Sequence, residues 1–376
     1  MSGPSQAALG GLLALAVAIG IGRFVYTPIL PPMMAALGLS GTTAGLIASA
    51  NFLGYLIGAL LAALPALPGK RRAWLIGALV LAAVTTGAMG LTVSVPGFLL
   101  LRFVGGGASA FVLILASTAV LEALGKAGRP GLAALHFAGV GCGIAVSALL
   151  VTGLLKAGQA WPSLWLWSGG LSLLATLGAA ALLRPPAEPA PFARGRGASG
   201  TGAGLRRLVA AYGLFGFGYI ITATFLVAIV RKTPAVSPLE PLIWIVFGVA
   251  AAPSVALWNR VAAVVGIPGA FAAACVAEAA GVLASVGWQT EVGVLVAAVL
   301  VGGTFMGLTA LGLMQARALA VGDPRRALAL MTGAFGLGQI VGPSFAGALS
   351  DRFGNFTLPS LAAVAALLVA AVLACR

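Results

Sequence analysis

Long runs of apolar residues, separated by short polar stretches, repeat along the whole chain. Each run reaches about the 20 residues that a helix needs to cross a bilayer. The strands of a membrane barrel would instead be shorter and would alternate apolar and polar positions. The pattern therefore predicts an all-α integral membrane protein with twelve spans, which begin near Ala7, Thr42, Ala73, Pro96, Gly131, Trp161, Leu205, Pro238, Val264, Val292, Ala327 and Thr357.

The composition agrees with this pattern. Of the 376 residues, 61% are hydrophobic and 7% are charged, and the mean hydropathy is +1.11. No soluble globular domain needs so much apolar surface to fill its core, so we expect the lipid bilayer to surround the protein. The cysteines Cys142, Cys275 and Cys375 lie in or at the ends of the predicted spans without metal-ligand spacing, which predicts neither disulfides nor a metal site.

The basic residues predict the orientation. If the N-terminus is cytoplasmic, the loops on that side hold 15 of the 21 lysines and arginines, and only four, Lys156, Arg231, Lys232 and Arg352, lie outside. The other two, Arg23 and Arg102, fall within spans. Cytoplasmic loops are enriched in Lys and Arg, so both termini are predicted to be cytoplasmic. Residues 1–6 lack the basic start of a signal peptide, which favours a retained first span. The net charge of +14 then reflects this bias and attraction to anionic lipid, and not a nucleic-acid surface.

A stretch rich in Pro, Gly, Ala and Arg divides the chain. We expect residues 184–204 to form a flexible cytoplasmic linker. The flanking regions, 1–183 and 205–376, are then an N-terminal and a C-terminal bundle of six helices each.

An internal repeat supports this division. The segment Gly20-Ile21-Gly22-Arg23 returns 196 residues later as Gly216-Phe217-Gly218-Tyr219, and Leu30 maps to Leu226 at the same offset. Because both halves begin in the cytoplasm, the repeat is parallel, with a pseudo-two-fold axis along the membrane normal. This organisation is typical of secondary transporters.

Arg23 is the first candidate for a functional residue, because it lies inside an apolar run. Burying an arginine at the centre of a bilayer costs on the order of 3 kcal/mol, so such residues mark functional sites by default. On a helix it shares a face with Tyr26 and Thr27, which predicts one wall of a substrate site. The alternative is that Arg23 extends to the membrane interface.

Arg102 shares a helix face with Gly105, Gly106 and Ser109. Two roles stay open for it: binding an anionic group or tuning a proton site, and bonding to carbonyls of neighbouring helices to fix the packing of the first bundle.

Four further residues, on the second and seventh spans, extend the candidate substrate site. Tyr219 takes the place of Arg23 in the second half, and Thr222 shares its face. An arginine opposite a tyrosine suits a substrate with a carboxylate and an apolar or aromatic body, although span tyrosines also serve packing. On the second span, Asn51 and Tyr55 share a face, and Asn51 is either a ligand or a bond between helices.

Two residues are candidates for proton coupling. Glu278 is the only carboxylate well inside a predicted span, and His136, the sole histidine, begins the fifth span. The alternatives are a Glu278 that stays protonated and bonded, and a structural His136. One histidine and seven acids, mostly in loops, together with no intact Walker motif, argue against an enzyme, a cofactor or ATP as the energy source.

Three segments resemble a known family. Residues 20–33, 135–145 and 338–356 are similar to the first-, fifth- and eleventh-span signatures of the YbfB/YjiJ group of the major facilitator superfamily. The superfamily's loop motif between spans two and three is half present, with Ala66 where an aspartate belongs, and Asn259 replaces that aspartate in the second half. Arg102 and the glycines after it resemble a motif of proton-coupled members.

The resemblance implies that spans one, four, seven and ten line a central cavity, and that the two bundles rock around it. It places span nine at the periphery, which counts against Glu278. We therefore expect a monomeric secondary transporter of the bacterial inner membrane that moves a small-molecule substrate, favoured to be an organic anion, by alternating access with proton coupling. The alternatives are efflux of lipophilic compounds and a transport-inactive sensor or structural protein on the same fold.

Overall fold

The computed structural model describes residues 3–62, 70–183, 202–320 and 324–375. The predicted linker falls largely outside these ranges, as does Ala66 of the loop motif. All regular secondary structure in the described part is helical and no strand occurs there, which confirms the predicted all-α fold.

The described residues of the first half form seven α-helices and a π-helical segment in the middle of the first span. Their bounds are α1 (Pro4–Leu15), η1 (Ala16–Ile21, the π-helical segment), α2 (Tyr26–Leu37), α3 (Gly41–Ala62), α4 (Arg71–Ala88), α5 (Val95–Lys126), α6 (Ala133–Lys156) and α7 (Trp161–Leu182), with 3₁₀ turns η2 (Met89–Leu91) and η3 (Pro130–Leu132). The second half contains α8 (Ala203–Lys232), the 3₁₀ turn η4 (Ser237–Leu239), α9 (Glu240–Ala251), α10 (Ser254–Gly287), α11 (Glu291–Leu319), α12 (Pro324–Phe353) and α13 (Thr357–Cys375).

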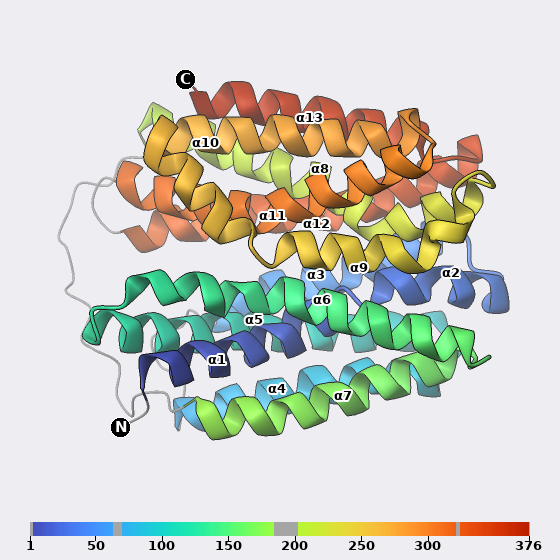
Figure 1. Ribbon diagram of the computed structural model, residues 1–376, viewed down its shortest axis with the longest axis horizontal. Helices are drawn as coiled ribbons and strands as arrows, with labels where there is room; N and C mark the ends of the chain where they lie inside the picture. Colours follow the sequence, from blue (N-terminus) through green and yellow to red (C-terminus); the bar gives the residue numbers. More distant parts are fainter. Residues whose placement is uncertain (1–2, 63–69, 184–201, 321–323, 376) are drawn as a thin grey trace.

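Within the described residues, eleven helical segments are long and apolar enough to cross a membrane, and residues Ser237–Ala251 form a shorter apolar helix. The twelve predicted spans are recovered because α10 contains two helices. They meet at Gly266, whose φ of 77° and ψ of 162° are not helical. The ribbon of α10 bends back on itself at this point (Figure 1). The eighth span therefore consists of α9 and the first part of α10, and the ninth is the remainder.

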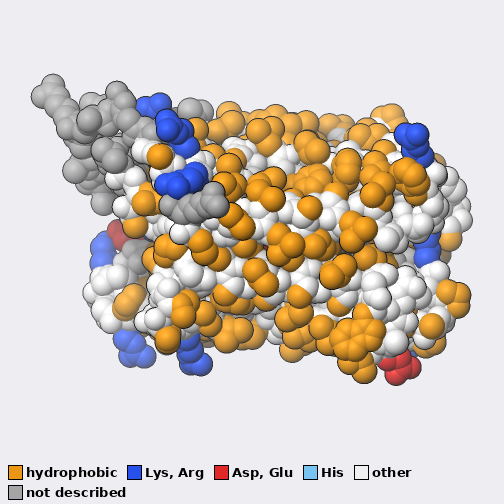
Figure 2. Space-filling view, turned by 90° about the horizontal axis from the view of Figure 1, so that it is seen from above, with side chains coloured by type: hydrophobic (Ala, Val, Ile, Leu, Met, Phe, Trp, Pro, Cys, Tyr) orange, Lys and Arg blue, Asp and Glu red, His pale blue; other side chains and the backbone are white. Residues whose placement is uncertain are grey.

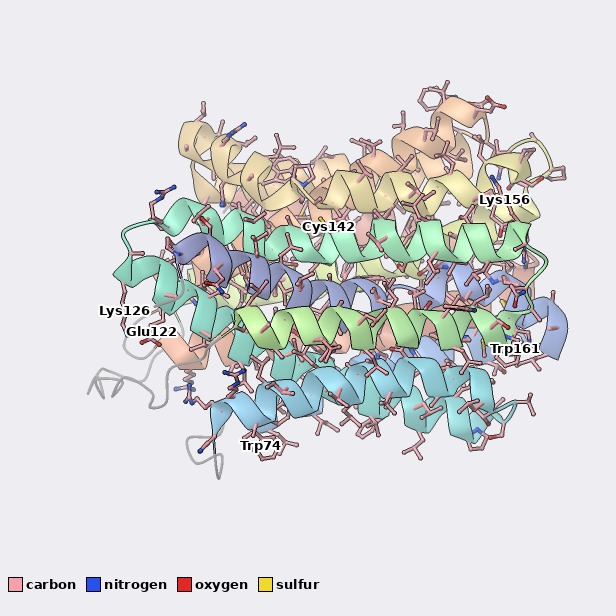
Figure 3. All side chains as sticks on the ribbon, turned by 60° about the horizontal axis from the view of Figure 1, so that its bottom comes forward. Trp74, Glu122, Lys126, Cys142, Lys156 and Trp161 are labelled. Carbon is pink, nitrogen blue, oxygen red and sulfur yellow. The ribbon has the colours of Figure 1, made fainter. Side chains whose placement is uncertain are left out.

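The helices lie side by side along the long axis, with α1 to α7 in the lower part of Figure 1 and α8 to α13 in the upper part. Both chain ends lie at the left of this view. Apolar side chains cover the middle of the surface, and Lys and Arg lie toward its two ends (Figure 2). Glu122 and Lys126 lie at one end, whereas Lys156 and Trp161 lie at the other (Figure 3). The apolar middle is the surface that a bilayer covers.

The two halves contact each other through α3 with α12 and through α6 with α9. Glycines allow the backbones to approach closely. A Cβ atom at Gly45 would lie 2.2 Å from the carbonyl oxygen of Pro343, and one at Gly141 would lie 2.2 Å from the nitrogen of Ala252. These positions accept no side chain larger than hydrogen without a shift of the backbone.

Several hydrogen bonds between the halves lie in the part of the molecule remote from the chain termini. Asp351, near the end of α12, accepts bonds from the backbone N–H groups of Gly41 (2.7 Å) and Thr42 (2.8 Å) at the start of α3. Ser49 donates to the carbonyl oxygen of Ile340 over 2.6 Å. A carboxylate at a helix N-terminus is favourable, because it satisfies free N–H groups and complements the helix dipole.

Candidate functional site

The first span is broken at the point where Arg23 lies. After the π-helical segment η1, residues 22–25 form a turn, and α2 follows with Pro28 in its first turn. Proline has no N–H and its ring clashes with the preceding helical turn, so the sequence cannot continue as one regular helix. The N–H of Thr27 bonds to the carbonyl of Phe24 instead of that of Arg23. The carbonyl oxygens of Gly22 and Arg23 are thereby left for other donors.

Arg102 on α5 supplies these donors. Its Nη1 donates to the carbonyl oxygen of Gly22 over 2.9 Å, and its Nη2 donates to that of Arg23 over 3.1 Å. The guanidinium also lies 5.0 Å from the ring centre of Tyr26. A bare carbonyl costs several kcal/mol in the membrane interior, so these bonds stabilise the break. These contacts match the second role considered for Arg102, in which it bonds to backbone carbonyls and fixes the packing of the first bundle.

Arg23 itself is only 6% exposed and does not extend to the membrane interface. Its guanidinium carbon lies 4.3 Å from the ring centre of Tyr55 and 5.2 Å from that of Phe52, both on α3. Its Nε and Nη2 atoms have no hydrogen-bond partner. The ion pairs found in the described ranges, Lys126 with Glu122 and Arg231 with Glu240, do not include it. Cation–π contacts offset part of the cost of burial, and the N–H donors of these two nitrogen atoms stay unused.

Tyr219 on α8 faces this arginine from the other half. Its ring is stacked between Phe305 and Phe335, with centroids 5.7 and 5.8 Å away, and its hydroxyl accepts a hydrogen bond from Nε2 of Gln339. The charge of Arg23 and the hydroxyl of Tyr55 lie within Coulombic range of this phenol. The structure therefore brings Arg23, Tyr55 and Tyr219 together.

The other predicted wall residues lie around this group with different contacts. The Thr222 hydroxyl, one turn beyond Tyr219, is fully buried and has no hydrogen-bond partner. Tyr26 donates to the carbonyl of Ala44 over 2.8 Å, and Asn51 donates to the carbonyl of Arg102 over 2.9 Å. One polar atom of Tyr26 and one of Asn51 are therefore occupied by a bond to a neighbouring backbone, whereas the hydroxyl of Thr222 is not.

An aromatic cluster adjoins the polar group. Phe24 packs against Phe305 (centroids 5.6 Å apart) and Trp244 (6.3 Å), and Trp244 stacks on Phe247 at 4.4 Å. A few polar groups next to a large apolar and aromatic surface are the usual composition of a site for a small organic ligand.

Glu278 lies inside the second half, on the part of α10 that follows Gly266. It is fully buried, and neither carboxyl oxygen has a hydrogen-bond partner. The neighbouring Thr304 hydroxyl donates to the carbonyl of Leu300 over 2.6 Å. Tyr219 lies within Coulombic range of Glu278. This carboxyl group therefore lies within electrostatic reach of the Tyr219 side of the site, without a recorded contact to Tyr219.

His136 on α6 is remote from this group. Its Nε2 lies 2.9 Å from the Ser117 hydroxyl, and it packs on Gly11, where a Cβ atom would lie 2.2 Å from its Nδ1. Gly11 is about three helical turns before Arg23. The structure does not bring the two proton-coupling candidates together. Within the described ranges, no three His, Cys, Asp or Glu side chains gather as metal ligands.

Sequence reasoning missed two buried amides. Gln339 on α12 is fully buried and bonds to Tyr219, and Gln315 on α11 is 8% exposed; one side-chain oxygen of each lacks a partner. Both lie within long apolar runs, so the argument that identifies Arg23 also applies to them.

Comparison with known proteins places this geometry in context. Residues 15–375 match the model of a family described as uncharacterised MFS-type transporter YbfB. No curated protein shows a significant sequence match to the chain. A point mutant of the nucleoside transporter NupG has a similar structure, with a TM-score of 0.74 and 15% sequence identity over 98% of both chains. A bacterial homolog of the human lysosomal transporter Spinster has a TM-score of 0.69 and 15% identity over 98% of this chain and 94% of its own. These similarities confirm the fold.

Proposed function

Because the chain belongs to the family of MFS-type transporters described by YbfB, we propose that it is a proton-coupled secondary transporter of a small organic anion. It acts by alternating access, as a monomer in the bacterial inner membrane with both termini in the cytoplasm. Two bundles, residues 1–183 and 205–376, move relative to each other, and the linker between them permits the motion. The substrate binds between the bundles near the middle of the membrane.

The observation that carries the substrate class is the guanidinium of Arg23, which forms no ion pair with a carboxylate of the described residues. It is buried among aromatic rings with two nitrogen atoms free of hydrogen bonds. A carboxylate is the group that pairs best with such a fork of donors. Tyr219 and the aromatic side chains around Phe305 would then contact the apolar or aromatic body of the substrate. Arg102, whose donors are occupied by backbone carbonyls, acts as a packing residue.

The distribution of contacts between the halves supports alternating access. The bonds of Asp351 to Gly41 and Thr42, and of Ser49 to Ile340, lie toward the ends remote from the termini. With cytoplasmic termini, these bonds close the outer side. Arg23 and Tyr219 are each less than 10% exposed in this conformation, so the substrate reaches them only when the halves separate.

Glu278 is the proposed proton carrier. A fully buried carboxyl group that has no cationic partner among the described residues is favoured in its neutral form and becomes costly when ionised. Separation of the halves that admits water beside Tyr219 would lower this cost and release the proton. Substrate binding at Arg23 and proton exchange at Glu278 then share one aromatic partner, Tyr219.

Transport in proteoliposomes tests the proposal. Wild-type protein is assayed with a panel of aromatic and aliphatic carboxylates, neutral nucleosides and lipophilic cations, with and without a pH gradient. We expect uptake or efflux of carboxylates, driven by the gradient, and its loss in Arg23→Gln. The matched control is Arg206→Gln, which removes an exposed arginine from the start of α8. Equal transport by wild type and Arg23→Gln would overturn the assignment.

Efflux of lipophilic compounds is the second candidate function. The packed rings of Phe24, Trp244, Phe247 and Phe305 favour it, because an aromatic surface also binds uncharged organic molecules. The same panel separates the two functions. Transport of neutral and cationic lipophiles that is unaffected by Arg23→Gln would establish efflux in place of anion transport.

A further inference from the structure

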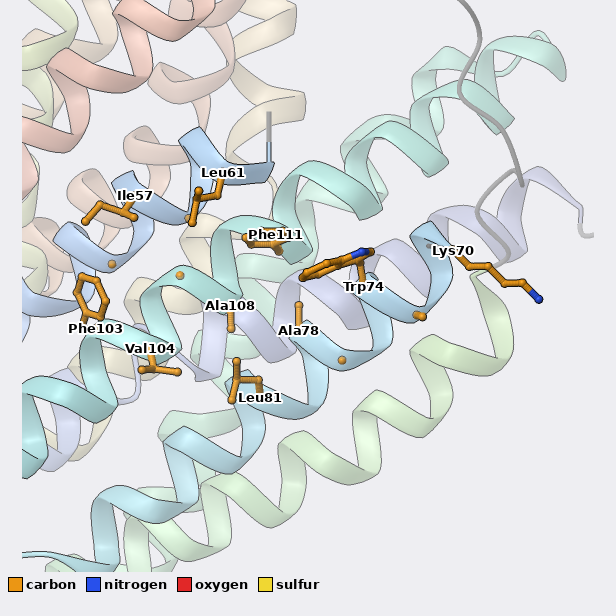
Figure 4. A pocket seen from close by; sticks show the side chains of 15 residues that line it. Ile57, Leu61, Lys70, Trp74, Ala78, Leu81, Phe103, Val104, Ala108 and Phe111 are labelled. Atoms are coloured by element: carbon orange, nitrogen blue, oxygen red, sulfur yellow. The ribbon is translucent and has the colours of Figure 1, made fainter. Parts of the chain in front are cut away.

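An open crevice lies on the outside of the first half, away from the site around Arg23. It has a volume of about 650 Å³ and is lined by α3, α4 and α5 (Figure 4). None of the side chains that form the candidate substrate site lines it. Its volume falls within the range of specific ligand sites.

Glycines shape the crevice. At its floor α3 and α5 touch: a Cβ atom at Gly54 would lie 1.8 Å from the carbonyl oxygen of Phe103, and one at Gly58 would lie 2.6 Å from that of Gly107. On the opposite wall, a Cβ atom at Gly77 of α4 would have no atom within 4 Å. The first two glycines bring α3 and α5 together, and the third leaves open space between them and α4.

The lining is apolar along almost its whole length. Ile57, Leu81 and Phe103 line it, and Ile57 and Leu81 are exposed on the surface that the bilayer covers. Toward one end Trp74 stacks on Phe111 with centroids 5.5 Å apart. A tryptophan at the end of a span is typical of the level of the lipid headgroups.

The same end carries positive charge. Lys70 lines the crevice there, and Arg71 and Arg72 follow at the start of α4. No ion pair of these three residues occurs in the described ranges, where the recorded pairs involve Lys126 and Arg231. Arg72 donates to the carbonyl of Ala180 over 3.0 Å, which leaves its charge without a counterion. A basic end on an apolar crevice complements a negatively charged headgroup joined to a hydrocarbon chain.

We propose that this crevice is a specific site for an anionic phospholipid. One acyl chain lies along Ile57, Leu81 and Phe103, and the phosphate contacts Lys70 beside Trp74. The lipid binds from the leaflet at the level of the chain termini. This site is independent of the substrate proposed above, because it shares no side chain with the Arg23 group.

Quenching of tryptophan fluorescence tests the proposal. Full-length protein, stripped of lipid in neutral detergent, is titrated with phosphatidylglycerol that carries brominated acyl chains, and the Trp74 contribution is isolated by comparison with Trp74→Phe. We expect saturable quenching at low lipid concentration, with phosphatidylcholine binding about fivefold more weakly, the factor expected for one lysine near a charged headgroup.

Two pairs of variants locate the site. Gly77→Leu fills the open space of the crevice, and Gly170→Leu adds the same side chain at an exposed position of α7 where a Cβ atom also meets nothing within 4 Å. We expect at least tenfold weaker binding for Gly77→Leu alone. Lys70→Gln is expected to remove the preference for phosphatidylglycerol, whereas Lys126→Gln, with the same loss of charge at the same end, retains it.

Thermal unfolding of each variant checks that it is folded. Wild-type affinity in folded Gly77→Leu, or equal affinity for both lipids in the wild type, would overturn the proposal. A loss of binding in both glycine variants would do the same, because it would show general contact with the protein surface.

Discussion

Thr27 donates a hydrogen bond of 2.8 Å from its hydroxyl to the carbonyl oxygen of Ala223. These two residues are 196 positions apart, the offset that maps Arg23 onto Tyr219. Equivalent positions of the repeat therefore meet, as expected for residues close to a pseudo-two-fold axis between the halves.

Replacing Thr27 with valine keeps the shape of the side chain and removes this bond. We expect the variant to lose about 1 kcal/mol of stability, the usual net value of one buried hydrogen bond. Thr118→Val is the control, because the Thr118 hydroxyl is exposed and bonds within its own helix. Thermal unfolding in detergent measures both, and equal shifts would show that the bond between the halves contributes nothing of its own.

The two intramembrane arginines are expected to respond in opposite ways to substitution. Arg102→Met deprives the carbonyls of Gly22 and Arg23 of their donors, so we expect a loss of about 3 kcal/mol or more. Arg23→Met removes a buried charge with two unpaired nitrogens, so stability should stay unchanged or rise. Unfolding midpoints of the two variants test this, and greater destabilisation by Arg23→Met would contradict it.

Two adjacent glycines of α5, Gly106 and Gly107, differ in how closely they pack against α3. A Cβ atom at Gly106 would lie 1.9 Å from the carbonyl oxygen of Asn51, whereas one at Gly107 meets its nearest neighbour at 3.5 Å. We expect Gly106→Ala to lower the yield of folded protein severely and Gly107→Ala to be tolerated. Size-exclusion chromatography of the two variants decides this, and similar profiles would show that the helices separate without cost.

Asp351 is expected to hold the outer side closed. In Asp351→Asn the two N–H groups at the start of α3 lose a charged acceptor, and we expect opening to increase about tenfold, since a bond to a charged group contributes about 1.5 kcal/mol or more. The labelling rate of Ser49→Cys by a membrane-impermeant maleimide, in a background without the native cysteines, reports opening. Glu291→Gln, a change of one carboxylate at the start of α11, should leave the rate unchanged. Equal rates in Asp351→Asn and wild type would refute this role.

Glu278→Gln is expected to separate binding from energy coupling. The amide is similar in size to the neutral carboxyl group, and the carboxyl oxygens have no partner to lose, so the fold should persist. Transport driven by a pH gradient should disappear, while exchange of substrate down its own gradient continues. Glu291→Gln is again the control. Gradient-driven transport by Glu278→Gln at the wild-type rate would exclude Glu278 as the proton carrier.

Much of the fold follows from the sequence because lipid permits few spanning structures. The length of the apolar runs predicts helices, and the repeat pairs Arg23 with Tyr219 before any contact is known. The eighth span is less regular than predicted, since α9 ends at Ala251 and Pro253 lies before the next helix.

The orientation of side chains is harder to predict. The spans are apolar on most faces, so periodicity does not determine which way each polar residue points. Arg102 and His136 both lie in apolar helices, and only the structure shows that carbonyls, a serine and a glycine surround them. The role of Arg102 also depends on free carbonyls in a different span, and local pattern contains no signal for such a partner.

The junction at Gly266 joins two spans without an intervening loop. On one side of it Ala252 packs against Gly141 across the contact between the halves, and on the other side lies Glu278, within Coulombic range of Tyr219. Only a few backbone torsions therefore separate the eighth span from the ninth, and a displacement of the eighth span passes to the ninth through them. The interface with α6 and the buried carboxyl group are mechanically connected along a single stretch of backbone, whereas the two halves are joined covalently only through the long segment that follows α7.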